Sequence, residues 1–228
     1  MQAAAYEQTY LILAGLFIAA LVACNLIFQK FFMLELPLPG GGSYVFRQSV
    51  GIIAYPLTFL VTDILSEIYG ARRANQVVVA GLVASVFTTG LVELADLSTS
   101  AEFGIGDATF HQVFGLSKVA VFASMMAYLT AQFIDIRLFH FWKRLTKGKH
   151  LWLRNNASTI SSQVVDTFMV LALLAAFEAG GITWAIVPRL FLDGLLFKVS
   201  FAALDTPLFY LAVRTLERKF PDAVALVE

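Results

Sequence analysis

The sequence predicts an all-α integral membrane protein, a bundle of six transmembrane helices in one domain that covers residues 1–228. Hydrophobic residues make up 59% of the chain and charged residues 14%, whereas soluble proteins average roughly 45–50% and 25%. A soluble domain of this length could not bury so much apolar surface. The apolar residues also gather into stretches close to the ~20 residues that a helix needs to cross a bilayer.

Six such stretches occur along the chain, near residues 10–28, 50–68, 74–92, 116–133, 159–177 and 190–213. We expect the fourth helix to continue beyond the membrane, past Asp135 towards Trp142. The loops between the six spans are short. The chain therefore leaves no room for an additional soluble domain.

Lysine and arginine residues are distributed unevenly between the two sets of loops. The N-terminus, residues 69–73, residues 134–158 and the C-terminus together hold eleven of them, whereas the opposite loops hold only Lys30, Arg47 and Arg189. Short cytoplasmic loops carry the excess of positive charge in membrane proteins. We therefore expect both termini to face the cytoplasm.

Several classes of function are disfavoured by what the sequence lacks. Sixteen basic residues balance sixteen acidic ones, so there is no net field to attract nucleic acid, and no nucleic-acid partner is expected. The single Cys24 cannot form an internal disulfide. There is no phosphate-binding loop, nucleophile elbow or histidine–cysteine cluster with metal-ligand spacing. We therefore expect no cofactor, no metal and no enzymatic activity.

Polar side chains inside the predicted spans are more informative. A charged group at the bilayer centre costs roughly 2.5–3.5 kcal/mol, so such groups usually face the bundle interior and mark a site or pathway. One face of the second span repeats an aromatic or acidic residue at every fourth position: Tyr55, Phe59, Asp63 and Glu67. Residues at this spacing share a helix face. Glu67, near the cytoplasmic end, has the alternative of a structural pair with Arg72 or Arg73.

The fifth span is polar only in its cytoplasmic half, where Thr159, Gln163 and Asp166 share one face. Hydrogen bonding between helices is the structural alternative for such groups. The first span adds Asn25 near its outer end, together with a small-residue face typical of close helix packing, formed by Gly15, Ala19 and Ala23.

The sixth span carries Lys198 and Asp205, which are seven residues apart. The rise between them is about 10 Å along the helix, so we do not expect them to pair. Lys198 is expected to meet a carboxylate of another helix, Asp63 or Asp166, and a buried ion pair that fixes the helix register is the structural alternative. Ionisable and amide groups on several helices together predict a polar cavity within the membrane.

Four segments of the chain carry a resemblance to a known family. They are Thr58–Asp63 continuing to Glu67–Gly70, Ala157–Thr159 with Asp166 and Thr167, Phe197 with Lys198, and Ser124–Tyr128 with Gln132 and Asp135. In this combination and spacing, the sequence resembles the queuosine precursor transporter family, also called the vitamin uptake transporter family. The resemblance covers residues 10–215, nearly the whole chain.

The resemblance implies a multi-pass transporter of the bacterial inner membrane. Its implied substrates are 7-cyano-7-deazaguanine (preQ0) and 7-aminomethyl-7-deazaguanine (preQ1), and its implied partners are this purine-like solute and the lipid bilayer, with a homo-oligomer left open. It also implies a six-helix bundle similar to the substrate-binding component of energy-coupling-factor transporters, acting without an ATPase module.

The polar residues of the spans are chemically compatible with such a base. A deazaguanine presents a ring N–H beside an amino group, which one carboxylate can accept together. Its carbonyl needs a donor, and its flat rings suit aromatic walls. The candidate substrate-binding residues are Asn25, Tyr55, Phe59, Asp63, Glu67, Gln163, Asp166, Lys198 and Asp205.

Two other functions stay open at this point. The small-residue face of the first span resembles the face that energy-coupling-factor components use for docking, so the chain could be a binding subunit that needs a separate ATPase. An intramembrane enzyme or a structural scaffold is the third hypothesis, and it would require that the membrane carboxylates are dispensable.

Overall fold

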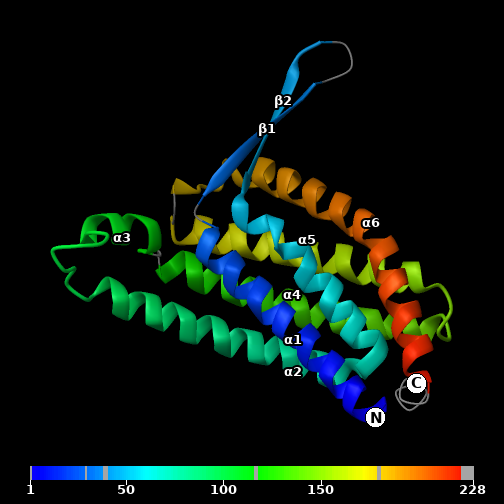
Figure 1. Cartoon of the computed structure of the whole chain (residues 1–228). Helices are drawn as coiled ribbons and strands as arrows, with labels where there is room; N and C mark the ends of the chain where they lie inside the picture. Colours follow the sequence, from blue (N-terminus) through cyan, green and yellow to red (C-terminus); the bar gives the residue numbers. More distant parts are fainter. Residues whose placement is uncertain (1, 29, 38–40, 116–117, 179–180, 222–228) are drawn as a thin grey trace.

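The computed structural model describes residues 2–28, 30–37, 41–115, 118–178 and 181–221. Helices dominate the described chain, as the sequence predicts, and Figure 1 shows the long ones packed into one bundle. In order, the elements are α1 (Gln2–Ile27), β1 (Phe31–Pro37), β2 (Ser43–Ser49), the 3-10 turn η1 (Val50–Ile53), α2 (Tyr55–Asp96), α3 (Asp107–Phe114), α4 (Lys118–Leu145), α5 (Leu151–Ala176) and α6 (Val187–Lys219).

The predicted second and third spans are two arms of α2, residues 55–69 and 71–96, which meet at Gly70. This glycine has φ 80° and ψ 166°, a conformation that side chains with a Cβ rarely adopt. The chain reverses there, so that Tyr6 of α1 contacts Ile68 while Asn25, at the other end of α1, contacts Ser85. A single non-helical residue therefore separates the two arms.

An antiparallel hairpin lies between α1 and α2, where the sequence analysis expected only a loop. β1 pairs with β2 from Phe31 opposite Ser49 to Pro37 opposite Ser43, and the hairpin projects away from the helices (Figure 1). The Tyr44 hydroxyl donates a hydrogen bond to Asp193 of α6. The rings of Phe46 and Phe197 stack at 5.6 Å between centroids, so the hairpin is fastened to the start of α6.

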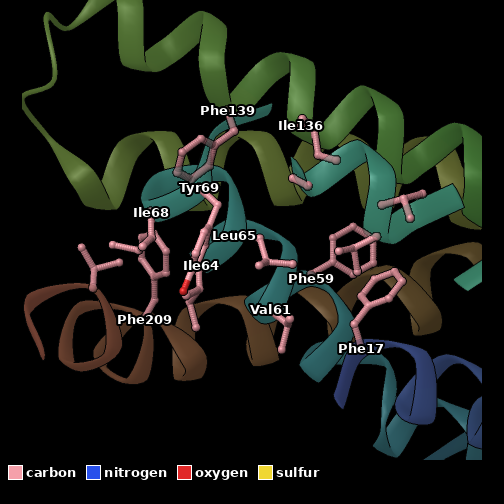
Figure 2. Close-up of a cluster of buried hydrophobic side chains, with 14 of the residues drawn as sticks. Phe17, Phe59, Val61, Ile64, Leu65, Ile68, Tyr69, Ile136, Phe139 and Phe209 are labelled. Carbon is pink, nitrogen blue, oxygen red and sulfur yellow. The ribbon is translucent and has the colours of Figure 1, made fainter. Parts of the chain in front are cut away.

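The first arm of α2 runs through the centre of the hydrophobic core, and nearly every residue from Thr58 to Tyr69 is buried. Figure 2 shows Phe59, Leu65 and Ile68 of this arm among aromatic rings from the surrounding helices. The rings come from Phe17 of α1, Phe139 of α4 and Phe209 of α6, each fully buried. The arm that carries most of the predicted acidic face is therefore enclosed by other helices.

Within the described residues, four segments are long and apolar enough to cross a membrane: α1, η1 with α2, α5 and α6. The predicted fourth span begins at residues 116–117, outside the described residues, and continues as α4 past Asp135 to Leu145, as expected. Large apolar side chains such as Phe87 and Leu211 lie on the exterior, about 65% exposed in each case. An apolar exterior around a polar interior is the arrangement that a bilayer requires.

The first turns of α1 and the end of α6 lie beside each other at one end of the bundle (Figure 1). The rings of Tyr6 and Phe220 are 5.4 Å apart, and Arg73, which follows the break in α2, forms an ion pair with Glu7 at 2.8 Å. The N-terminus, the α2 break and the end of α6 therefore share one side, in agreement with the loop pattern of the sequence.

Candidate functional site

A cavity of about 90 Å³ lies between α1, both arms of α2, α4 and α5. Its apolar wall includes Leu21, Leu82 and Val170. Its polar lining comes from four helices and consists of Asn25, Tyr55, Ser85, Ser124, Tyr128 and Asp166. The cavity is therefore an apolar pocket with a few convergent polar groups, the usual character of a small-molecule site.

One wall of the cavity carries a complete ion pair. The Lys198 ammonium donates to Asp166 Oδ2 at 2.6 Å and to Thr167 Oγ1 at 3.0 Å, and it lies 4.5 Å from the centre of the Tyr55 ring. The predicted carboxylate partner of Lys198 is thus Asp166, whereas Asp63 is bonded elsewhere.

Neutral polar groups complete the cavity lining. The Asn25 amide donates to Ser85 Oγ at 3.2 Å. The buried hydroxyls of Tyr55 and Tyr128 have no hydrogen-bond partner among the described residues, and their rings meet edge to face with centroids 6.1 Å apart. Because buried polar groups are normally bonded, these two hydroxyls are available to a ligand.

Asp63 lies away from this cavity, two helical turns further along the first arm of α2. Its carboxyl group is 2% exposed and accepts a hydrogen bond from Thr159 Oγ1 at 3.1 Å. Its second oxygen, Oδ1, is buried without a partner among the described residues. Asp135 accepts in turn from Ser162 Oγ at 3.0 Å, so the polar face of α5 serves both carboxyl groups.

Glu67 has a structural environment of its own at the end of the arm. Arg154 of α5 reaches it at 2.6 Å and Lys143 of α4 at 3.3 Å. The alternative that Glu67 pairs with Arg72 or Arg73 is wrong, because Arg73 pairs with Glu7 and the partners of Glu67 come from other helices. This buried cluster ties three helices together, and it lies outside the cavity lining.

The other predicted residues are distributed between the core and the acidic region. Phe59 belongs to the hydrophobic core and contacts the Tyr55 ring at 5.2 Å. Gln163 is 3% exposed, and its carbonyl oxygen has no partner among the described residues. Asp205 is partly buried, with one carboxylate oxygen likewise unpartnered. None of these three side chains lines the cavity.

The structure therefore brings four of the predicted residues together: Asn25, Tyr55 and Asp166 line the cavity, and Lys198 adjoins it. Sequence reasoning missed Cys24, Ser85 and Met125 as cavity residues. Ser85 could have been found in the sequence, because it is a hydroxyl residue within the predicted apolar span 74–92. Ser124 and Tyr128 share a polar face of the predicted fourth span and both line the cavity, but they were not among the candidate substrate-binding residues.

Comparison with known proteins supports a transport function. Residues 49–212 match the family model described as "Putative vitamin uptake transporter". A protein of Bacillus subtilis (strain 168) named "Probable queuosine precursor transporter" is 27% identical over 167 residues, which cover 72% of this chain and 71% of that protein. The "Queuosine precursor transporter" of Escherichia coli (strain K12) is 28% identical over 153 residues, covering 67% of this chain and 65% of its own.

No solved structure matches the chain. The family resemblance identified in the sequence is confirmed, because the matched residues cover well over half of the chain and include all four segments that carried the resemblance. The chain belongs to the vitamin uptake transporter family.

Proposed function

We propose that this protein imports queuosine precursors, the deazaguanine bases preQ0 and preQ1, across the bacterial inner membrane. The observation that carries the proposal is the cavity inside the helical bundle, with the Asp166–Lys198 pair and two unpartnered tyrosine hydroxyls at its wall. Family membership and the names of the relatives support the same substrate class.

The groups around the cavity complement the edges of a deazaguanine. The carboxylate of Asp166 can accept from a ring N–H and its neighbouring amino group together. Lys198 and the Asn25 amide can donate to the base carbonyl. The Tyr55 and Tyr128 rings offer faces and edges for the flat heterocycle. In this assignment Asp166, one of the candidate carboxylates, reads the edge of the base.

The size of the cavity agrees with a small ring system. Its volume of about 90 Å³ is several times the ~10–15 Å³ that one water molecule needs on the same scale. A single solvent molecule would leave most of this space empty. Cys24 and Met125 give part of the wall soft, apolar surface, which suits the carbon-rich face of the base.

The proposal includes six membrane crossings with both termini in the cytoplasm. α2 has 42 residues and would measure about 63 Å as one straight helix, twice the ~30 Å core of a bilayer. The reversal at Gly70 divides it into two crossings. With α1, α4, α5 and α6 the total is six, and an even number agrees with the start of α1 and the end of α6 lying side by side.

Orientation can be tested by labelling. Cysteines placed in residues 93–115 should react with an impermeant reagent from outside the cell, and a cysteine at Lys147 should not. The native Cys24 is buried and should give little background. The reverse labelling pattern would overturn the assignment of the two membrane sides.

Transport itself is tested with purified protein in liposomes. The intact protein should take up labelled preQ0, and preQ0 should raise its melting temperature in detergent more than guanine or vitamins do. Asp166→Asn should abolish uptake, whereas Asp193→Asn, a control carboxylate 4% exposed but bonded to the hairpin, should retain it. A thermal shift with a vitamin and none with either deazaguanine would refute the substrate assignment.

A binding subunit that needs a separate ATPase is the second candidate, and one observation favours it. Gly15 and Ala19 of the small-residue face are exposed, and a Cβ added at Gly15 would meet no other atom within 4 Å. This face is therefore not used for packing among the described residues. Uptake by the purified protein alone would exclude the requirement, whereas binding without uptake would support it.

A further inference from the structure

Two carboxyl groups face each other between helices in the polar interior. Asp63 of α2 is 2% exposed and Asp135 of α4 is fully buried, and both carboxyl groups lie against hydroxyls that stand one turn apart on α5. The other oxygen of each group, Asp63 Oδ1 and Asp135 Oδ2, is buried without a partner among the described residues. Thr159 and Ser162 of α5 donate to the outer oxygens at 3.1 and 3.0 Å. We refer to Asp63 and Asp135 as the carboxyl pair.

The charged groups around the carboxyl pair do not neutralise it. On α6, Lys198 is engaged by Asp166, and Asp205 adds a third acidic group close to both members of the pair. On α5 and α4, Arg154 and Lys143 are engaged by Glu67 of α2. Of the other titratable groups on either side of Asp135 in α4, Tyr128 is buried and His140 half-buried, whereas Arg137 and Arg144 are exposed. Within the described part of the chain, no cation contacts either member of the pair.

Two buried carboxyl groups against the same face of α5, with no cation in contact, disfavour a state in which both are ionised, because the like charges repel and each of them is desolvated. One proton between them satisfies both: the protonated group donates, and the ionised group accepts. A proton is therefore the ligand that this arrangement suits. Among the described residues, no group of three acidic, histidine or cysteine side chains could hold a metal ion.

A second observation connects the carboxyl pair with the cavity. Gln132 is fully buried, yet neither its amide nitrogen nor its carbonyl oxygen has a partner among the described residues. It stands on the same face of α4 as Tyr128, four residues earlier, and Asp135, three residues later. Tyr128 lines the cavity. Gln132 therefore lies between the ligand cavity and the carboxyl pair, with donor and acceptor capacity to spare.

We propose that the carboxyl pair is a proton-binding site that couples the import of a purine-like base to the entry of one proton. The proposal rests on the function proposed above. Protonation allows the first arm of α2 and α4 to remain in contact through a hydrogen bond. Release of the proton leaves two like charges at that contact and favours its separation. One O–H bond forms when the proton binds from the outside, and the same bond breaks when the proton leaves to the cytoplasm.

The experiment uses the full-length protein in liposomes with labelled preQ0 as the probe. At zero membrane potential, an alkaline interior should drive accumulation of about tenfold per pH unit, since one proton moves with each base and one pH unit is a tenfold concentration ratio. Asp63→Asn should lose this accumulation while keeping the equilibrium exchange of preQ0. The Asp193→Asn control should keep both.

The outcomes separate the two proposals. Wild-type protein that neither binds nor exchanges preQ0 would contradict the proposed substrate. If the wild-type protein exchanges preQ0 but does not accumulate it in response to the pH gradient, only the proton site is contradicted. Accumulation by Asp63→Asn equal to that of the wild type would contradict the proton site in the same way.

A measurement on the wild-type protein without substrate tests the proton site even if one of the variants fails to fold. Its infrared spectrum should contain a carboxylic-acid C=O band that shifts in heavy water and disappears on alkaline titration. Asp135→Asn should remove this band, and Asp193→Asn should retain it. Absence of the band from the wild type at neutral and acidic pH would overturn the proton site.

Discussion

The cavity and the carboxyl pair lie on the same helices, about 10 Å apart along α4, but their charges are balanced differently. At the cavity, Asp166 has an ammonium group 2.6 Å away. At the carboxyl pair, Asp63 and Asp135 have hydroxyl donors and each other, but no cation within the described residues. The comparison indicates that the cavity holds a permanent ion pair suited to substrate recognition, whereas the carboxyl pair is suited to bind and release a proton.

The largest effect should come from breaking the ion pair at the cavity. Lys198→Met leaves Asp166 buried without its cation, and loss of one partner of a buried pair costs about 3–5 kcal/mol. Thermal unfolding in detergent should report this loss, and preQ0 uptake should disappear.

A second substitution identifies the partner of Lys198. Adding Asp166→Asn to Lys198→Met should restore much of the stability, because removal of both charges of a buried pair can be nearly neutral. It should not restore uptake. Adding Asp63→Asn instead should leave the protein destabilised, and equal rescue by both substitutions would contradict the pairing seen in the structure.

A direct comparison of the two regions comes from binding affinity. Asp166→Asn should weaken preQ0 binding by about 1.5–3 kcal/mol, the contribution of a hydrogen bond to a charged group. Asp63→Asn should leave the Kd close to that of the wild type, because Asp63 does not line the cavity. Titration calorimetry measures both, with unfolding monitored in parallel. The opposite order of effects would move the base-binding site to the carboxyl pair.

The break in α2 should have an intermediate effect on stability. Gly70→Ala places a Cβ at φ 80° and should cost about 1–2 kcal/mol, the penalty of a left-handed conformation. Gly15→Ala is the matched control, because an added Cβ there meets no atom within 4 Å and alanine favours a helix by about 1 kcal/mol. Equal melting temperatures for the two variants would argue against a strained reversal at Gly70.

The smallest effects should come from the tyrosine hydroxyls. Tyr55→Phe and Tyr128→Phe remove hydroxyls without a partner in the described structure, so stability should be unchanged while preQ0 binding weakens by about 0.5–1.5 kcal/mol. Tyr69→Phe removes a hydroxyl that donates to the Tyr6 carbonyl at 2.9 Å and should lower stability without affecting binding. Unchanged affinity in both cavity variants would show that the hydroxyls do not contact the base.

Much of the helical arrangement follows from the sequence, because apolar length and helical period are local properties of the chain. The positions of the long helices, the extension of α4 beyond Asp135 and the presence of a carboxylate partner for Lys198 could all be predicted. The hairpin between α1 and α2 was missed, since Tyr44 and Phe46 are fixed by Asp193 and Phe197, about 150 residues later.

The candidate site shows where local information ends. Tyr55 and Asp63 are eight residues apart, which places them on one helix face, but this spacing does not show that the neighbouring helices surround them with different groups. Glu67 pairs with Arg154, 87 residues away, and not with Arg72 or Arg73, which are close to it in the sequence. Tertiary packing therefore decided which acids are paired.

The sequence by itself determined a membrane-embedded helical bundle with charges inside it, because a bilayer tolerates apolar exteriors and makes every buried charge expensive. Only the tertiary structure decided that Asp166 is matched by Lys198 while Asp63 and Asp135 face each other. The physical reason is distance: electrostatic and hydrogen-bond energies fall off over a few ångströms, and which side chains come that close depends on how helices far apart in sequence pack.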